Sequence, residues 1–162
     1  MGMSEIVLRE YRGKDLEGIT RLDEACFAKE FRFDRWSMQS FVEAENAISV
    51  VAERTGGGIA GFVIVHVDRL AGRLIGYVVT LDVAAEERRK GLASQMMNDV
   101  ERRAQIVGAR WMELHVYTGN KGAIRFYEEM GYERVGVRLG FYGAPGRDAF
   151  VYRRELFLFV TK

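Results

Sequence analysis

Apolar residues recur along the chain at two spacings: every second position, as in strands, and every third or fourth, as in helices. The strand spacing predicts strands at 6–11, 48–53, 59–67, 74–83 and 111–117, with two more after residue 131. The helical spacing predicts helices at 16–26, 37–42, 92–107 and 121–130. The predicted order is therefore β-α-α-β-β-β-α-β-α-β-β, an α/β (α+β) chain.

Polar residues and glycines mark where these helices begin and end. Asp15, Ser37 and Asn120 can each accept a hydrogen bond from the first turn of a following helix, and are predicted N-caps. With Ser37 as cap, the aromatic segment Phe31–Trp36 is a loop. The third helix carries one apolar stripe and is expected to stop at Gly108; the stripe comprises Leu92, Met96, Val100, Ala104 and Val107.

Composition narrows the class of protein. The 162 residues correspond to one domain, 1–162, with no linker, and are 48% hydrophobic with a formal net charge of +1. This near-neutral charge gives no support for nucleic-acid binding, and no apolar run reaches the roughly 18 residues of a membrane span. One cysteine and two histidines are too few for a disulfide framework or a zinc site, so no metal is expected. We expect a soluble, cytoplasmic protein without a targeting signal.

The stretch between the strand ending at Val83 and the helix beginning at Leu92 carries the strongest functional signal. Three consecutive cations, Arg88, Arg89 and Lys90, precede Gly91. A helix N-terminus offers free N–H groups and a partial positive charge, and glycine lets an anion approach the backbone. The segment is therefore predicted to hold a pyrophosphate. The alternative is a solvated basic turn, although cations at a helix N-terminus oppose the helix dipole.

Two motifs resemble those of a known family. Arg-x-x-Gly-x-Ala at Arg88–Ala93 is similar to the (Gln/Arg)-x-x-Gly-x-(Gly/Ala) signature of the GNAT acetyltransferases. The run Asn120–Tyr132 resembles that family's Asn-x-x-Ala-x-x-x-Tyr-x-x-x-Gly-Phe/Tyr segment. The resemblance spans nearly the whole chain. It implies the GNAT fold, with a mixed central sheet of about seven strands and about four helices, and acetyl-CoA as co-substrate.

The resemblance also implies which residues hold acetyl-CoA. The acetyl-pantetheine arm would enter between two central strands that splay apart, and a backbone N–H at or near Val83 would hold the thioester oxygen. Tyr127 would lie near the sulfur and protonate the departing thiolate. The implied cofactor-binding set is Leu81, Asp82, Val83, Arg88, Arg89, Lys90, Gly91, Leu92, Ala93, Ser94, Asn120 and Tyr127. Tyr127 could instead be a buried anchor of a short helix.

A closer resemblance points to the residues that deprotonate the amine. Tyr77, and His115 within Leu114-His115-Val116, resemble positions of the NatE-type protein N-terminal acetyltransferases that act in this step, whereas RimI-type enzymes have Glu where His115 falls. Neutral imidazole can accept a proton near pH 7. We therefore predict Tyr127, His115 and Tyr77 as catalytic, with Glu113 as a second candidate base. A lone strand histidine is often only structural.

The acceptor is expected between the loop 31–36 and the last hairpin at 141–145, because both carry aromatic residues. The predicted substrate-binding residues are Phe31, Phe33, Trp36, Phe141 and Tyr142, although such aromatics could equally be ordinary core. The family resemblance favours the α-amine of a protein or peptide N-terminus. The alternatives are acetylation of a small amine or a lysine side chain, and a non-catalytic acyl-CoA sensor. The protein is expected to be a monomer or homodimer.

Overall fold

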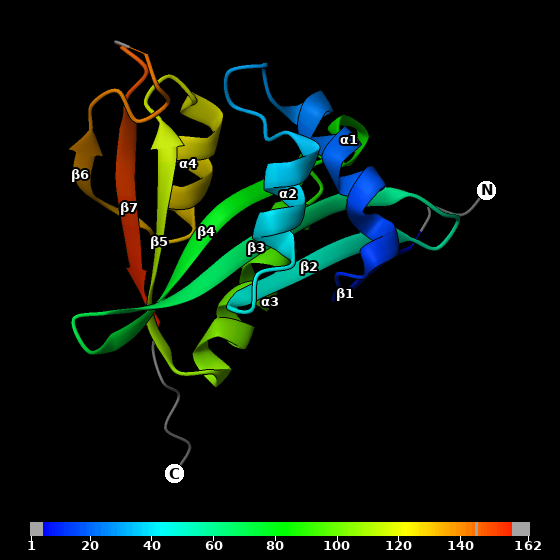
Figure 1. Ribbon diagram of the computed structural model, residues 1–162, viewed down its shortest axis with the longest axis horizontal. Helices are drawn as coiled ribbons and strands as arrows, with labels where there is room; N and C mark the ends of the chain where they lie inside the picture. The colour runs from blue at the N-terminus through cyan, green and yellow to red at the C-terminus, as the bar shows by residue number, and fades with distance from the viewer. Residues whose placement is uncertain (1–4, 145, 157–162) are drawn as a thin grey trace.

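The computed structural model describes residues 5–144 and 146–156, which form a sheet flanked by α-helices (Figure 1). The strands are β1 (Ile6–Glu10), β2 (Ala47–Arg54), β3 (Ile59–Leu70), β4 (Arg73–Val83), β5 (Ala109–Tyr117), β6 (Glu133–Arg138) and β7 (Ala149–Glu155). The helices are α1 (Leu16–Cys26), α2 (Arg35–Val42), α3 (Leu92–Ile106) and α4 (Lys121–Glu129). Short 3-10 turns occupy Gly13–Asp15 and Ala85–Glu87. This order confirms the one predicted from the sequence.

The strands form one mixed sheet in the order β1-β2-β3-β4-β5-β7-β6. All neighbouring strands are antiparallel except β4 and β5, which run parallel. Helix α3 makes the crossover between these two, because parallel strands cannot be joined by a tight turn. The mixed seven-stranded sheet implied by the resemblance is confirmed for the described residues.

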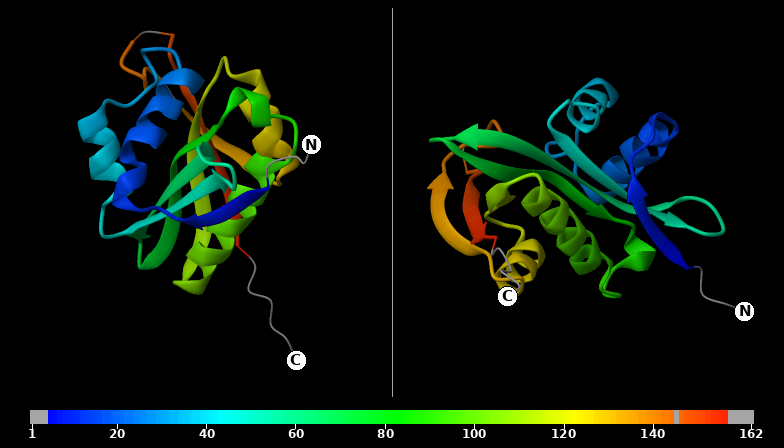
Figure 2. Two further views of the ribbon diagram at one scale, coloured as in Figure 1. Left: turned by 90° about the vertical axis from the view of Figure 1, so that its right-hand side faces the viewer. Right: turned by 90° about the horizontal axis from the view of Figure 1, so that it is seen from below.

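Helices cover both faces of the sheet: α1 and α2 lie on one face, α3 and α4 on the other (Figure 2). A larger apolar core lies under α3 and includes Met96, Met97, Val100, Met112 and Tyr152, all without exposed surface. A smaller core lies under α1 and α2, and is formed by Leu16, Ile19, Met38, Val42, Val51, Phe62 and Ile64. The central strands β2 to β5 are therefore largely buried between two helical layers, as their apolar residues require.

Strands β4 and β5 separate part-way along their length. Their pairing runs from Leu74 opposite Ala109 to Val78 opposite Leu114, and ends there. A β-bulge at Val79 follows, because β3 pairs with Val78 and Thr80 but skips Val79. Bulges increase local twist, so β4 turns away from β5 at this residue (Figure 1). We call the separated segments, 79–83 of β4 and 115–117 of β5, the β4–β5 fork.

Helix α2 begins two residues earlier than predicted. Its N-cap is Asp34, whose carboxylate accepts a hydrogen bond from Ser37 N at 2.7 Å. The prediction that Ser37 caps this helix was wrong, because Asp and Ser both suit the position and only the extended backbone at Asp34 decides between them. Trp36 consequently lies in the first turn of α2 rather than in a loop.

The other predicted helix ends mostly agree with the structure. Asn120 caps α4, accepting a hydrogen bond from Ala123 N at 3.2 Å. The prediction for Val107 was wrong: it was expected on the buried stripe of α3, but it is 53% exposed. The helix ends at Ile106, and Gly108 adopts a positive φ of 105° that turns the chain away.

Asp15 immediately precedes α1, as predicted, but its carboxylate does not cap the helix. It is only 4% exposed and accepts two hydrogen bonds from the Arg9 guanidinium, each at 2.8 Å, and one from Arg12 N. Arg9 also binds Glu53 of β2. The hydrogen bonds from Arg9 hold the pKa of Asp15 below its ordinary value. This ion pair ties β1 and β2 to the start of α1.

Replacing Asp15 with Asn should lower the free energy of unfolding at pH 7 by about 1–3 kcal/mol, because the half-buried Arg9 loses the more buried of its two charged partners. A lowered native-state pKa contributes stability above the unfolded-state pKa that is lost as the pH falls. Urea unfolding at pH 7 and at about pH 3.5 should therefore show a smaller acid loss in Asp15→Asn than in the parent. The exposed Glu17→Gln is the control, and an unchanged acid slope in Asp15→Asn would contradict this role.

Candidate active site

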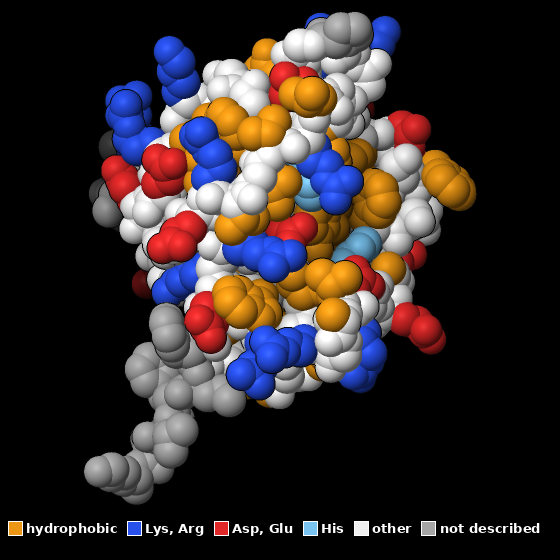
Figure 3. Space-filling view, turned by 90° about the vertical axis from the view of Figure 1, so that its left-hand side faces the viewer, with side chains coloured by type: hydrophobic (Ala, Val, Ile, Leu, Met, Phe, Trp, Pro, Cys, Tyr) orange, Lys and Arg blue, Asp and Glu red, His pale blue; other side chains and the backbone are white. Residues whose placement is uncertain are grey.

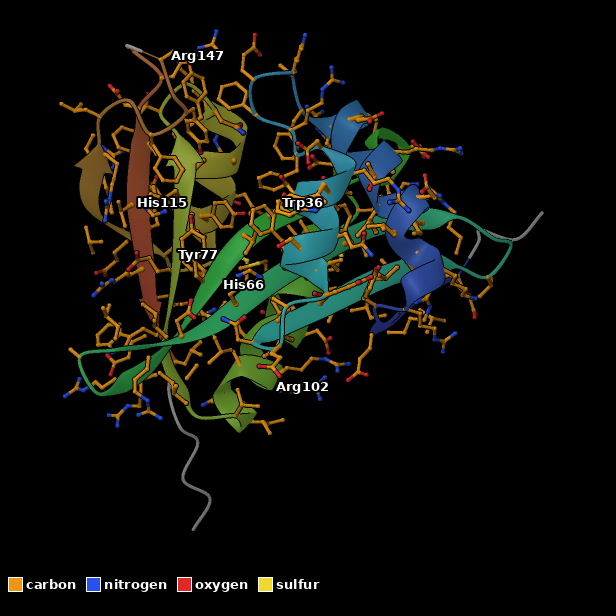
Figure 4. All side chains as sticks on the ribbon, in the orientation of Figure 1. Trp36, His66, Tyr77, Arg102, His115 and Arg147 are labelled. Carbon is orange, nitrogen blue, oxygen red and sulfur yellow. The ribbon has the colours of Figure 1, made fainter. Side chains whose placement is uncertain are left out.

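Tyr77 and His115 meet at the base of the β4–β5 fork. Tyr77 lies two residues before the bulge in β4, and His115 is the first residue of β5 beyond the paired region. The Tyr77 hydroxyl and His115 Nδ1 are 2.8 Å apart, a hydrogen bond that joins the two diverging strands (Figure 4). The structure thus brings together the two residues that the sequence analysis selected for deprotonating an amine.

The His115 imidazole is enclosed by aromatic rings. Phe141 stacks on it, with ring centroids 4.3 Å apart and planes 2° from parallel. His115 Nε2 is buried and has no hydrogen-bond partner among the described residues. Burial lowers the pKa of His115, so the ring is neutral at pH 7, and raises the pKa of Tyr77 to about 12. The site therefore holds a neutral pair with one free ring nitrogen.

The surface around this pair is hollowed and largely apolar. Figure 3 shows both histidines, in pale blue, among hydrophobic side chains with charged residues around them. Glu113, the second candidate base, forms an ion pair with Arg153 at 2.7 Å. His66 Nε2 lies 2.8 Å from the carbonyl oxygen of Phe41 and so has a structural partner. Of the two histidines, His115 is the one with a buried ring nitrogen that has no hydrogen-bond partner among the described residues.

The two aromatic segments predicted to hold the acceptor do lie against each other. Phe31, from the loop after α1, packs on Tyr142 at 4.9 Å and on Tyr117 at 5.0 Å between ring centroids. Tyr142 in turn packs edge-on against Phe141, which covers His115. Pro145, the last residue of the predicted hairpin segment, lies outside the described residues.

The other two predicted acceptor residues lie apart from this group. Phe33 packs edge-on against Phe41 at 5.0 Å and belongs to the core beneath α1 and α2. Trp36 is 77% exposed on α2, in a shallow depression lined by Gln39, Ser40 and Glu43. Residue type alone could not separate these roles, because all five candidates are aromatic. Tyr117, which the sequence analysis did not select, joins the group because it ends β5.

The basic loop before α3 leaves the start of that helix uncapped. Gly91 is the N-cap residue with φ 83°, and no side chain accepts from the first turn. The first helical hydrogen bond runs from Gln95 N to Gly91 O at 3.1 Å. The N–H groups of Leu92, Ala93 and Ser94 therefore have no carbonyl partner within the helix. Arg89, with φ 64°, and Lys90 are exposed beside this end.

Other loop residues are engaged in the fold. Arg54 pairs with Glu86 and Glu87, which fixes the 3-10 turn at Ala85–Glu87. Arg88 Nε donates to the carbonyl oxygen of Val83 at 3.2 Å. Such an uncapped, positively charged helix end can bind a phosphate group through backbone N–H groups and the helix dipole.

Tyr127 projects from α4 toward the fork. Its side chain is 9% exposed and packs edge-on against Phe126 and Tyr132. Burial, followed by the charges of Asp82 and Tyr142, raises the pKa of Tyr127 above its ordinary value. The hydroxyl is therefore protonated at neutral pH, and it lies near enough to Asp82 of the fork and to Tyr142 for their charges to act on it. A buried, protonated tyrosine fits both roles predicted for Tyr127, that of proton donor and that of packed aromatic anchor.

Residues 16–132 match the acetyltransferase (GNAT) family, which covers more than half of the chain. The chain belongs to the GNAT acetyltransferase family. The N-alpha-acetyltransferase daf-31 of Caenorhabditis elegans is 31% identical over 112 residues, which are 67% of this chain and 61% of that protein. The catalytic subunit NAA10 of the Arabidopsis thaliana N-terminal acetyltransferase A complex is 32% identical over 108 residues, 65% of this chain and 56% of that protein. This GNAT chain thus matches about three fifths of these relatives' length.

Solved structures agree with the GNAT fold over almost the whole chain. A. thaliana NAA60 in complex with a bisubstrate analogue has a TM-score of 0.80 at 26% identity, covering 93% of this chain and 98% of that one. The Escherichia coli ribosomal-protein-S18-alanine N-acetyltransferase has a TM-score of 0.82 at 17% identity, covering 95% and 96%. The second comparison shows a shared fold only.

In residues 5–144 and 146–156, none of the helices is both long and apolar enough to cross a membrane. Over the same residues, no three His, Cys, Asp or Glu side chains gather where they could bind a metal ion.

The buried environment of His115 predicts a titration below pH 6.5. Because burial lowers its pKa, the imidazole should gain its proton only as the pH falls below the ordinary histidine value. NMR of the two imidazoles between pH 5 and 8, assigned with a His115→Gln variant, measures this directly. Phe141→Ala should raise the pKa toward 6.5 by exposing the ring. A His115 midpoint at or above 6.5 in the parent would show that the ring is not buried in this way.

Proposed function

We propose that this GNAT chain is an acetyl-CoA-dependent N-acetyltransferase, RimI-like and NatE-like, whose acceptor is the α-amine of a protein or peptide N-terminus. The hydrogen-bonded Tyr77–His115 pair carries the proposal. It lies at the base of the β4–β5 fork, beside the aromatic group of Phe31, Tyr142 and Phe141. A proton acceptor and an apolar surface thus occur where the fork could present a reactive carbonyl.

The cofactor side of the proposal rests on β4 and α3. The pyrophosphate of acetyl-CoA would bind the uncapped N–H groups of Leu92, Ala93 and Ser94, with Arg88, Arg89, Lys90 and Gly91 beside it. The pantetheine arm would follow the fork edge of Leu81, Asp82 and Val83, which β5 leaves unpaired. Asn120 would act indirectly, since its side chain caps the helix that carries Tyr127.

The chemistry requires one bond to form and one to break. The neutral amine nitrogen attacks the thioester carbonyl carbon, and the excess proton passes through one water to His115 Nε2. This needs the tautomer in which His115 Nδ1–H donates to the Tyr77 oxygen. A backbone N–H near Val83 would hold the oxyanion, a contribution of about 3–4 kcal/mol. The carbon–sulfur bond then breaks, and the Tyr127 hydroxyl gives its proton to the thiolate.

An α-amine suits this site better than a lysine side chain. With pKa values near 7.8 and 10.4, a lysine needs about 3.5 kcal/mol more to lose its proton at the same pH. His115 is a weak base in this buried setting, since burial lowers its pKa. The relatives support the same acceptor, since daf-31 and NAA10 are named as N-alpha- and N-terminal acetyltransferases.

Two other functions share the same cofactor residues. Acetylation of a small amine or a lysine side chain would differ only at the aromatic group around Phe31. A non-catalytic acyl-CoA sensor would bind the cofactor without product, but it would not need the Tyr77–His115 hydrogen bond. We place the protein in the cytoplasm, where acetyl-CoA is available, as a monomer or homodimer. Its near-neutral charge favours neither a nucleic-acid nor a membrane partner.

A side chain at position 91 should prevent acetyl-CoA binding. Gly91→Val would place a branched group at the uncapped helix end, so the cofactor should no longer raise the melting temperature, whereas the parent should gain several degrees at saturating ligand. Gly72→Val is the matched control. Gly72 has a similar φ of 79° and, like Gly91, open space around its missing Cβ, but it lies in the β3–β4 turn. An equal ligand shift in Gly91→Val and the parent would refute the phosphate site.

A panel of peptides should identify the acceptor. Peptides with a free N-terminus and varied first residues should release CoA and gain acetyl on the α-nitrogen by mass spectrometry. The same peptides with a blocked N-terminus and an internal lysine, and free polyamines, should react at least about tenfold more slowly. His115→Gln should lose about 10²–10⁴-fold in rate, and Glu113→Gln should retain most of it. Acetyl-lysine as main product, or binding without product, would establish one of the alternatives.

A further inference from the structure

Two aspartates whose carboxyl groups have no role in the proposed reaction face each other between α1 and β4. Asp23 has no exposed surface, and Asp82 is 1% exposed. Asp23 Oδ2 accepts a hydrogen bond from Phe33 N at 2.8 Å, and Asp82 Oδ1 accepts one from Thr80 Oγ1 at 2.6 Å. The remaining oxygens, Asp23 Oδ1 and Asp82 Oδ2, are buried without a donor among the described residues. The two carboxyl groups lie within hydrogen-bonding reach of each other.

This arrangement cannot hold two negative charges. Two ionised carboxylates side by side would repel each other in a medium of low dielectric constant, and each would keep an unsatisfied oxygen. One proton between them removes the repulsion and satisfies both oxygens. Burial raises the pKa of each group. The backbone N–H of Phe33 favours the charged form at Asp23, which leaves the proton on Asp82.

The charged groups around the pair do not remove the need for this proton. The charge of Glu24, on α1, raises the pKa of Asp23, and the charge of Arg32, in the loop after α1, lowers it. Arg88 acts on Asp82 from the basic loop, but its Nε donates to the Val83 carbonyl. Cys26 and Tyr127, on α1 and α4, are held in their neutral forms by burial, which raises the pKa of each.

The pair fixes one end of the loop that carries Phe31. Residues 27–34, which we call the acceptor loop, leave α1 after Cys26 and end at the Asp34 cap of α2. Asp23 holds the far end of this loop through Phe33 N, and the Cys26 thiol donates to the Val83 carbonyl at 3.3 Å. The same strand, β4, carries Tyr77 and borders the proposed pantetheine path. A shift of α1 against β4 would therefore move Phe31 relative to His115.

We infer that Asp82 donates a shared proton to Asp23, and that this carboxylic acid–carboxylate bond positions the acceptor loop on the cofactor strand. Asp23 is thus a positioning residue for the acceptor. This role rests on the proposed function. Its loss should weaken acceptor binding and leave acetyl-CoA binding largely intact, because the uncapped start of α3 does not involve α1.

Substitutions at Asp23 separate this role from general stability. Asp23→Ala removes the bonds to Phe33 and Asp82, and should raise the acceptor KM about tenfold or more while the acetyl-CoA Kd changes less than about twofold. Asp23→Asn keeps both bonds, since its oxygen can accept from Phe33 N and its amide can donate to Asp82; its KM should stay within about threefold of the parent. Glu24→Ala, exposed on the same helix, is the matched control. An Asn variant as impaired as Ala, or parallel losses of acceptor and cofactor affinity, would overturn the inference.

Two measurements do not depend on turnover and remain decisive if the protein acetylates no amine. The first of them also does not require that Asp23→Ala folds. Infrared spectroscopy of the parent at neutral pH should show the C=O stretch of a protonated carboxyl group, and this band should be absent in Asp82→Asn. Hydrogen exchange of the Phe33 amide should be slow in the parent and in Asp23→Asn, and about tenfold or more faster in Asp23→Ala. No protonated-carboxyl band in the parent, or Phe33 exchange unchanged by Asp23→Ala, would refute the shared proton or the anchoring of the loop.

Discussion

The separation of β4 from β5 is the constraint on which the rest of the structure depends. Pairing ends at Val78 and Leu114, and the bulge at Val79 turns β4 away. Backbone groups that would satisfy each other in a continuous sheet are left facing the fork, and a ligand with amide groups can satisfy them instead. Because α3 must cross between these parallel strands, its N-terminus begins at the end of β4. The open edge of β4 and the uncapped start of α3 therefore follow one another along the chain.

Burial decides the proton chemistry of the site. His115 is neutral and Tyr77 and Tyr127 are protonated because aromatic neighbours exclude water from all three. Glu113, the second candidate base, is engaged in an ion pair with Arg153. Under the proposed function, the acceptor side would contain a weak base in an apolar surface, which fits an amine that is already partly deprotonated at neutral pH.

The same principle extends to the helix on the opposite side of β4. The contact between α1 and this strand includes a pair of buried carboxyl groups and a thiol on a backbone carbonyl, in addition to apolar packing. Hydrogen bonds of this kind have a defined geometry, whereas apolar contacts can slide. The position of the acceptor loop relative to the fork is consequently set by directional bonds at Asp23, Asp82 and Cys26.

The sequence by itself determined the order of the elements, the GNAT resemblance and the uncapped basic helix start, because these follow from periodicity and from residues close together in the chain. Tertiary structure decided the rest. It placed Tyr77 against His115, 38 residues apart, and separated Phe31 from Phe33 and Trp36, which look alike by type. It also determined that Asp34, and not Ser37, caps α2, and that Asp23 lies beside Asp82. Whether a polar group finds a partner depends on residues distant in sequence, so no local pattern could have shown it.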